Sequence, residues 1–253
     1  MTTYSNSRLK TFQTCPLKFK FTYIDEIKVE RESIEAFLGQ RFHEVMEKIY
    51  TDINTITYSI DELMEYYEHL WDKFHNDNVV ITRKNKSIDD YRNAGKQFIR
   101  DYYTRYYPFN QGTVVGIEKQ INMDFNNDGK YVITGFIDRI DKKENGLYEI
   151  HDYKTSSSLP SQQYLDKDRQ LSLYHMGIRN IFDDIKDTRL IWHYAAFDKE
   201  IVSSRTEEQL ENIKSSVITL IDEIESTTVF IPKESGLCNW CDYQQYCDLR
   251  NRK

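Results

Sequence analysis

An aspartate and a lysine stand two positions apart near the middle of the chain, at Asp152 and Lys154. Successive side chains of a β-strand point to opposite faces, so residues two apart share a face. The preceding strand-like stretch carries Asp138. A three-residue loop at 144–146, with Gly146 in the left-handed conformation, would place Asp138 directly opposite Asp152. Two carboxylates and one ammonium group would then meet at one point of the predicted sheet.

Two neighbouring carboxylates repel each other unless a cation lies between them, and a hard divalent cation is a usual solution in proteins. The alternative is a set of cross-strand ion pairs on a wet sheet face, which the spacing alone leaves open. The neighbours of these charges include Phe136, Ile137, Ile150 and Tyr153, which indicate strands mostly buried on both sides. Unpaired charges are costly there, so the pattern favours a functional site.

The four cysteines have a spacing that suggests metal ligation. Cys238, Cys241 and Cys247 lie close together near the C-terminus, whereas Cys15 lies near the N-terminus. A cytoplasmic chain of this length does not need disulfides, and the tight C-terminal group is typical of metal ligands. Four thiolates fit either a tetrahedral zinc ion or a 4Fe–4S cluster. Zinc modules usually offer two local pairs of ligands, whereas this chain offers one cysteine and three.

The segments at 135–141 and 151–155 resemble the core of the RecB-like branch of the PD-(D/E)XK nucleases. That branch also carries a histidine on an early helix, which His43 matches. It further has a Gln-x-x-x-Tyr pair on the helix after the core, which Gln170 and Tyr174 match, on one helical face. The resemblance implies an α/β fold with a restriction-endonuclease-like core, in which helices flank a mixed sheet.

The resemblance also implies roles for individual residues. His43, Asp138 and Asp152 would ligate Mg²⁺ or Mn²⁺, and the Tyr153 carbonyl would complete the shell. Such an ion lowers the pKa of water and stabilises charge on phosphate oxygens. Lys154 would orient or deprotonate the attacking water and balance charge on the phosphate. A lysine beside a bound metal ion can have a depressed pKa, which would give it some base character. Gln170 and Tyr174 would hold the DNA strand or the catalytic lysine.

The segment at 5–16, which ends in Cys15 and Pro16, resembles the start of the iron–sulfur members of this branch. These include the AddB-type recombination nuclease and the CRISPR adaptation nuclease. The resemblance favours a 4Fe–4S cluster over zinc, bound by the cysteines at 15, 238, 241 and 247. Such a cluster would join the two ends of the chain in a C-terminal knuckle. Trp240 would shield it.

The predicted elements give these residues their places. Apolar residues at helical spacing predict helices in the first half of the chain, and alternation predicts a three-stranded meander over 113–154. We expect Ser7 to cap a short first helix and Pro16 to begin a second. The remaining predictions are a helix at 162–182, a strand at 190–197 and a helix at 207–224.

The domain organisation follows from these elements. We expect one nuclease domain over residues 1–253, with an N-terminal helical subdomain at 33–110 inside it. A C-terminal iron–sulfur segment at 232–253 would close onto Cys15. No motif covers the helical stretch at 53–107.

The charge balance, 34 basic against 41 acidic residues, does not by itself indicate a nucleic-acid binder. Phosphate contacts need only a local basic strip, however. Arg8, Lys10, Lys18 and Lys20 form one without an acidic residue between them, and a solvated helix face is the alternative. Glu118 on the first predicted strand is either a further carboxylate at the metal site or a solvated ion-pair residue.

The predicted activity is that of an exonuclease acting on DNA single strands or ends, in repair and recombination or in CRISPR adaptation. No phosphate-loop motif is present, so a helicase would be a separate partner, and a CRISPR integrase subunit is the other expected partner. We expect a cytoplasmic protein, because no apolar run of about 20 residues and no signal sequence is present. The alternatives are an endonuclease of the same fold and an idle DNA-binding or assembly module with a structural zinc.

Overall fold

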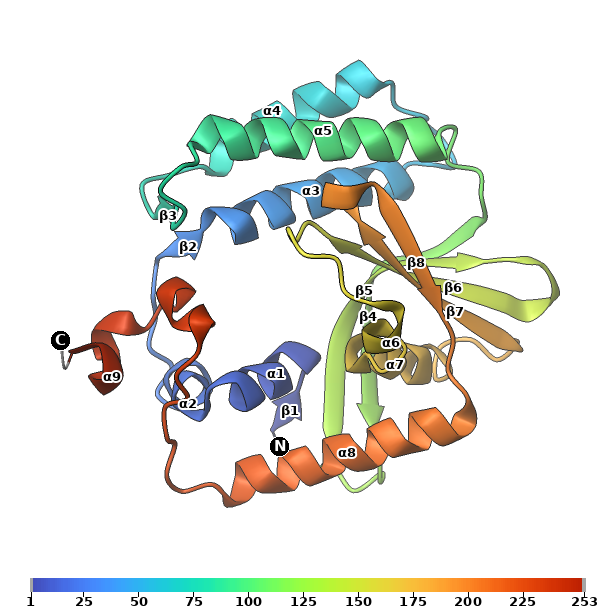
Figure 1. Ribbon diagram of the computed structural model, residues 1–253. Helices are drawn as coiled ribbons and strands as arrows, with labels where there is room; N and C mark the ends of the chain where they lie inside the picture. The colour runs from blue at the N-terminus through green and yellow to red at the C-terminus, as the bar shows by residue number, and fades with distance from the viewer. Residues whose placement is uncertain (1, 252–253) are drawn as a thin grey trace.

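The computed structural model describes residues 2–251. Within them, a six-stranded sheet lies at the centre, with helices on both faces (Figure 1). The strands are β1 (Thr3–Tyr4), β2 (Glu32–Ser33), β3 (Val79–Val80), β4 (Thr113–Asp124), β5 (Val132–Lys142), β6 (Leu147–Lys154), β7 (Asp187–Tyr194) and β8 (Lys199–Ser203). The helices are α1 (Asn6–Thr14), α2 (Pro16–Tyr23), α3 (Ile34–Thr51), α4 (Ile60–Phe74), α5 (Ile88–Tyr106), α6 (Gln162–Leu165), α7 (Arg169–Ile178), α8 (Glu207–Ser226) and α9 (Asp248–Asn251). Short 3₁₀ turns are η1 (Glu144–Gly146), η2 (Ala195–Phe197), η3 (Gly236–Trp240) and η4 (Gln244–Tyr246).

The sheet has the order β1-β5-β6-β7-β8, and β4 also pairs with β5. β4, β5 and β6 form the predicted antiparallel meander, whereas β6 and β7 run parallel and are joined through α6 and α7. A parallel pair needs such a crossover connection. The mixed sheet flanked by helices is therefore confirmed.

The hairpin between β5 and β6 sets the position of the predicted acids. Its loop is η1, and Gly146 has a φ of 75°, the left-handed conformation predicted for it. The ladder that follows ends at the pair Arg139–His151. One residue further, the same register sets Asp138 opposite Asp152. The ladder ends there, so these two residues stand where the strands separate.

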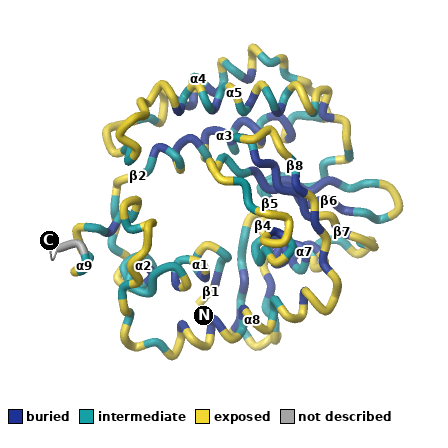
Figure 2. The backbone as a smooth tube through the Cα atoms, viewed as in Figure 1, coloured by how far each residue is buried: buried dark blue, intermediate teal, exposed yellow. Residues whose placement is uncertain are grey.

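Two hydrophobic clusters lie on the two sides of the sheet. The first packs α1, α7 and α8 against it, and the second packs α3, α4 and α5. The apolar residues of α3 follow helical spacing, and those at Phe37, Leu38, Val45 and Ile49 are buried. Figure 2 shows the buried interior strands beside the more exposed outer helices.

The stretch at 53–107, which no motif covers, forms α4 and α5. Each begins with a capping box, made by Ser59 with Glu62 and by Ser87 with Asp90. Both helices pack against α3 within the second cluster. This stretch therefore supports the helix that carries His43.

Two local predictions were wrong, and one strand was not predicted. Ser5, not Ser7, caps α1, and its hydroxyl accepts a hydrogen bond from the Arg8 amide at 3.1 Å. The predicted helix at 162–182 is broken, because Asp168 caps a separate helix α7 through the amide of Leu171. An aspartate that caps a helix ends any continuous helix before it. β8, which the sequence did not predict, forms the sheet edge beside β7.

The N-terminal helices and the C-terminal segment lie side by side, as the blue and red ribbons in Figure 1 show. Lys18 Nζ lies 3.5 Å from Asp242 Oδ2, and the rings of Phe21 and Tyr243 are 5.7 Å apart. The last two residues of the predicted iron–sulfur segment, 252–253, lie outside the described residues.

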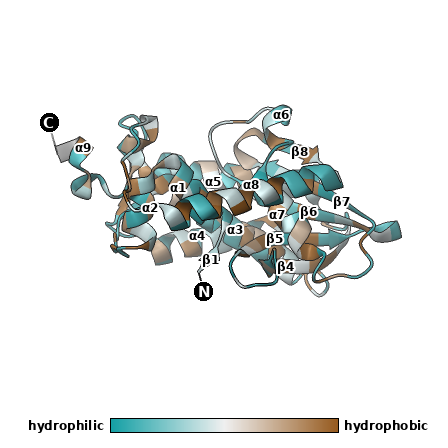
Figure 3. Cartoon of the chain, turned by 90° about the horizontal axis from the view of Figure 1, so that it is seen from below, coloured by the Kyte–Doolittle hydropathy of each residue, from teal (hydrophilic) through white to brown (hydrophobic). Residues whose placement is uncertain are grey.

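α8 runs along one side of the molecule and is amphipathic. Figure 3 shows apolar bands alternating with hydrophilic ones along it. Its apolar face belongs to the first cluster, through Val217, Leu220 and Ile221. Among residues 2–251, none of the helices has both the length and the apolar character needed to cross a bilayer.

Candidate functional site

A cavity of about 900 Å³ opens between α3, the first half of α5 with the loop before it, and the point where β5 and β6 separate. We call it the α3 cavity. Its lining includes His43 from α3, Glu118 from β4 and Asp138 from β5. Tyr153 and Lys154 at the end of β6 also line it. Residues far apart in the sequence are thereby brought to one place.

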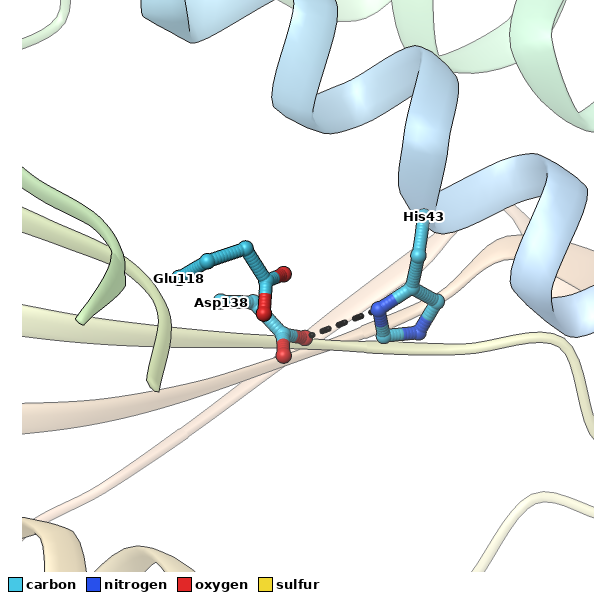
Figure 4. Close-up of side chains that lie close together, drawn as sticks. All are labelled: His43, Glu118 and Asp138. Atoms are coloured by element: carbon cyan, nitrogen blue, oxygen red, sulfur yellow. Dashed lines mark ion pairs between the residues drawn. The ribbon is translucent and has the colours of Figure 1, made fainter. Parts of the chain in front are cut away.

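His43, Glu118 and Asp138 form a compact group of possible metal ligands (Figure 4). One ligand atom from each lies within 4.8 Å of the other two. His43 Nε2 lies 2.9 Å from the Tyr153 carbonyl oxygen. A carbonyl oxygen only accepts hydrogen bonds, so the neutral His43 ring carries its proton on Nε2. The lone pair on Nδ1 is then available to bind a metal ion. Nδ1 lies 3.5 Å from Asp138 Oδ2.

Glu118 was left open by the sequence, and the structure brings it beside Asp138. Its φ of 43° is in the left-handed region, which is uncommon for a residue with a side chain. Burial, and then the charge of Asp138, raise the pKa of Glu118 to about 7. A cation beside these carboxylates would reverse that effect. The arrangement fits a divalent metal ion, with a nitrogen lone pair and carboxylate oxygens as its ligands.

Asp152 and Lys154 share a face of β6, as predicted. Lys154 Nζ lies 2.6 Å from Asp152 Oδ2, and Asp152 is 1% exposed. Gln170 donates to Asp152 Oδ1 at 3.1 Å and accepts from Lys154 Nζ at 3.3 Å. Asp152 is not in the compact group of ligands found around His43 within the described residues. It lies next to that group, across the opening between the two strands.

The pKa of Lys154 in this structure is set mainly by burial and by Asp152. Its surroundings lower the pKa through desolvation, but Asp152 more than offsets this, and the pKa of Lys154 is raised above its ordinary value. The pKa of Asp152 is raised by burial, with Lys154 opposing the shift. Without a metal ion, Lys154 is therefore an ammonium group that can donate to phosphate or water rather than a base.

Two further residues of the expected site have hydrogen bonds within the chain. The Tyr153 carbonyl, expected as a metal ligand, accepts the hydrogen bond from His43 and so orients that ring. Tyr174, expected to hold DNA or the lysine, is 7% exposed and lies against Gly135. Its hydroxyl accepts a hydrogen bond from Gln170 at 3.1 Å. Tyr174 is thus connected through Gln170 to the Asp152–Lys154 pair, in line with the second expected role, that of holding the lysine.

The basic strip is mostly occupied by internal contacts. The Arg8 guanidinium lies 5.0 Å from the ring centre of Tyr4, and it donates to the Thr3 carbonyl. Lys20 pairs with an aspartate of the same segment, and Lys18 lies near Asp242. Lys10 alone of the four basic residues lines a cavity near the site. Three of the four basic residues of the strip therefore have contacts within the chain.

A second cavity of about 1090 Å³ adjoins the first, between α1, the loop after β6, α6, α7 and α8. We call it the α1–α7 groove. Lys154 and Ser156 line both cavities. Its other cationic side chains come from Lys10, Lys167 and Arg169. Sequence inspection missed the last two, because their common location depends on the packing of α1 against α7.

The four cysteines line one cavity of about 250 Å³, although they come from opposite ends of the chain. The amide of Lys233 donates to Cys15 Sγ at 3.5 Å, and that of Ser235 donates to Cys238 Sγ at 3.4 Å. Such donors stabilise thiolates, the form in which cysteine binds metals. The expectation that Cys15 lies with the C-terminal cysteines is therefore met in the fold. The other two cysteines that line this cavity are Cys241 and Cys247.

A crystal structure of a candidate exonuclease from Eubacterium rectale has a TM-score of 0.53 at 10% identity, covering 98% of this chain and 87% of that chain. At this identity the likeness shows a shared fold. The structure of SSO0001 has 14% identity and a TM-score of 0.37, over 96% of this chain and 95% of that chain. No curated protein matches the sequence. The model of the PD-(D/E)XK nuclease superfamily matches residues 3–248, and the chain belongs to that superfamily.

Proposed function

We propose that the protein is a divalent-metal-dependent nuclease that removes nucleotides from single-stranded DNA or DNA ends. The observation that carries this is the meeting of two groups at the opening between β5 and β6. His43, Glu118 and Asp138 stand on one side, and Asp152 with Lys154 stands on the other. Metal ligands and an ammonium group are what phosphodiester hydrolysis needs side by side.

The residues present divide the work between them. His43, Glu118 and Asp138 would hold the ion, with Asp152 as a further ligand from the opposite strand. A Mg²⁺ or Mn²⁺ ion bound there lowers the pKa of a coordinated water and neutralises charge on the phosphate. The Lys154 ammonium group donates to the phosphate or to the attacking water. Gln170 keeps that ammonium group in place through its bonds to both members of the Asp152–Lys154 pair.

The α1–α7 groove supports DNA as the substrate. Its cations at Lys10, Lys167 and Arg169 give a local positive surface on a chain whose net charge is −7. Tyr164 also lines it and is 61% exposed. An exposed aromatic ring beside cations is typical of single-strand binding, because unpaired bases stack on such rings while the cations contact phosphates. The groove begins at Lys154, so a strand at the metal site has a continuous path into it.

The cysteine cavity supports a 4Fe–4S cluster. Its volume of about 250 Å³ is several times the roughly 30 Å³ that one water molecule occupies, so it has room for more than one ion. Four thiolates are the ligand set of such a cluster. We assign it a structural role, because its ligands tie α1 and α2 to the C-terminal segment. A reducing cytoplasmic location is consistent with thiols kept available for the cluster.

The test uses the purified, iron-loaded protein with linear and circular single-stranded DNA and with blunt duplex DNA. We expect release of nucleotides from linear single strands with Mg²⁺ or Mn²⁺, and none with EDTA. Faster cleavage of circular than of linear DNA would indicate an endonuclease instead. Failure to cleave any of these DNAs with either metal would contradict the proposed function.

A further inference from the structure

A buried arginine next to the proposed metal site has no role in the hydrolysis described above. Arg139 follows Asp138 on β5 and is 3% exposed. Its Nη1 donates at 2.9 Å to the hydroxyls of both Tyr102 and Tyr153. Its Nη2 lies 2.9 Å from His151 Nδ1. The guanidinium group is therefore fixed on several sides, within the core between the sheet and α5.

The charges around Arg139 balance it. Its Nε lies 3.1 Å from Asp141 Oδ1, and Asp141 is also 3% exposed. His151 Nδ1 accepts from the arginine, so the neutral His151 ring carries its proton on Nε2, which lies 3.4 Å from Asp141 Oδ2. An apolar side chain of similar size would often serve stability equally well in place of a buried ion pair. A role in positioning is the better explanation for these bonds.

Asp141, Glu149 and His151 also have ligand atoms within 4.8 Å of one another, which raises the question of a second metal site. Cationic side chains already occupy that position. Arg139 faces Asp141, and Lys143 Nζ lies 2.9 Å from Glu149 Oε2. The group is therefore a set of counter-charges that keeps Arg139 in the core.

Tyr153 connects Arg139 to two of the proposed metal ligands. Its backbone amide donates to Asp138 Oδ2 at 2.8 Å, and its carbonyl accepts from His43 Nε2 at 2.9 Å. Its hydroxyl accepts from Arg139. The ladder between β5 and β6 ends at the pair Arg139–His151, so Tyr153 lies beyond the backbone pairing of the two strands. The hydrogen bond from the Arg139 side chain to the Tyr153 hydroxyl therefore joins β5 and β6 just beyond the end of their backbone ladder.

We propose that Arg139 and the Tyr153 side chain are positioning residues that set the geometry of the metal site. The Arg139–Tyr153 bond fixes the separation of β5 and β6 just beyond the last ladder pair. That separation decides where the Tyr153 amide and carbonyl meet Asp138 and His43. Partners that orient metal ligands in this way typically change metal affinity or activity by about 10–100-fold when removed. This inference rests on the proposed function, because it concerns the same metal ion.

The test measures Mn²⁺ binding directly, by electron paramagnetic resonance titration of the free ion at fixed pH. Tyr153→Phe keeps the ring and removes only the hydroxyl. Tyr50→Phe is the matched control, because the Tyr50 hydroxyl is equally buried in the network and bonds only to Tyr102, at 2.6 Å. We expect the Kd for Mn²⁺ to rise about 10-fold or more in Tyr153→Phe. In Tyr50→Phe it should stay within about 2-fold of the wild type, a difference too small for the loss of an outer-shell partner.

Arg139→Lys is the second variant, because it keeps the charge and removes the forked set of donors. It should raise the Kd for Mn²⁺ at least as much as Tyr153→Phe does. If Tyr153→Phe folds poorly, Arg139→Lys tests the same proposal by itself. An unchanged Kd in Tyr153→Phe, or an equal loss in Tyr50→Phe, overturns the positioning role while leaving the nuclease proposal in place. A wild-type protein that binds no Mn²⁺ overturns the proposed metal site itself, and this inference with it.

Discussion

The ammonium group of Lys154 lies 2.6 Å from the carboxylate of Asp152, and both side chains project from one face of β6 into a shared bond with Gln170. The pair is asymmetric in exposure. The Asp152 side chain is 2% exposed and that of Lys154 is 33% exposed. The Lys154 side chain therefore lines both cavities, whereas that of Asp152 is buried. Lys154 is the member of the pair that can contact a substrate phosphate.

Replacing Lys154 by Ala should abolish DNA cleavage and keep the fold and iron content. A positioned proton donor contributes about 10²–10⁴-fold in rate, so we expect a loss in kcat of at least that order. Lys142→Ala is the control, since that residue pairs with Asp184 at the opposite end of the sheet. Single-turnover cleavage rates with Mn²⁺ check this. Near-normal cleavage by the Lys154 variant would remove the lysine from the mechanism.

Glu118→Gln should have opposite effects on the metal-free and metal-bound protein. In the folded state the Glu118 pKa is about 7, above the ordinary value of 4.5. Between those pH values the folded state binds more protons than the unfolded state, so metal-free stability falls as pH rises through this window. In Glu118→Gln the side chain no longer titrates, so this loss of stability at high pH is absent. The substitution also removes a proposed metal ligand. We expect the variant to be more stable than the wild type at pH 8 without metal, and less stabilised by Mn²⁺.

Thermal unfolding of both proteins at pH 5 and pH 8, with EDTA or saturating Mn²⁺, measures these effects. A ligand at 100 times its Kd stabilises a protein by about 2.7 kcal/mol. Glu211→Gln on the exposed face of α8 is the control and should follow the wild type. If Glu118→Gln gains as much from Mn²⁺ as the wild type does, Glu118 is not a ligand.

Reversing two charges in the α1–α7 groove should weaken the binding of long substrates. Lys10 and Lys167 are exposed and line it. Each phosphate contact to a single strand contributes about 0.7 to the slope of log affinity against log salt, so Lys10→Glu with Lys167→Glu should reduce that slope by about 1.4. The KM for a long oligonucleotide should rise, whereas hydrolysis of bis(p-nitrophenyl) phosphate should not change.

Lys186→Glu is the matched control for that pair, because Lys186 is exposed beside the start of β7, whereas Tyr194 at the end of β7 lines the groove. Fluorescence anisotropy over a salt series gives the slopes. Identical slopes in the groove variant and the wild type would show that the DNA strand takes another path.

Cys15→Ser should lose iron to the same extent as Cys241→Ser. The two residues come from opposite ends of the chain and line one cavity. A shared cluster clamps both ends, so its loss should lower the unfolding temperature of the whole domain in both variants. Iron and zinc analysis after anaerobic purification gives about four irons per chain if the cluster is present. Full iron content in Cys15→Ser, or one zinc in a colourless wild-type protein, would contradict the cluster.

Acid should destabilise the fold through buried histidines. Burial lowers the pKa of His151 and of His175 to about 4, from an ordinary value of 6.5. Between these values the unfolded state binds more protons than the folded state, so stability is lost as pH falls through this window. The loss is at most about 3.5 kcal/mol for each histidine, since one pKa unit corresponds to about 1.4 kcal/mol.

Urea unfolding at pH 7 and pH 4.5 tests this assignment. His175→Gln should lose less stability over that range than the wild type, and His69→Gln, on an exposed face of α4, should match the wild type. An equal pH dependence in all three proteins would show that His175 does not carry the effect.

The sequence by itself determined the part of the site that depends on local geometry. Asp152 and Lys154 share a face because strand side chains alternate, and Asp138 stands opposite because a three-residue loop fixes the register of the hairpin. Helical periodicity likewise predicted α3, the helix that carries His43. These features depend on residues that are close in the chain, so their spacing could be evaluated without the fold.

Only the tertiary structure decided which distant groups meet. Glu118 joins His43 and Asp138 through a left-handed backbone angle on another strand, which no side-chain pattern announces. Lys167 reaches the groove because it lies in the break between α6 and α7, and α7 packs beside α1. Arg8, by contrast, packs against Tyr4. The physical reason is that alternation and helical period fix the direction of a side chain only relative to its own strand or helix, while the contacts across the cavity depend on how the packed elements twist and cross.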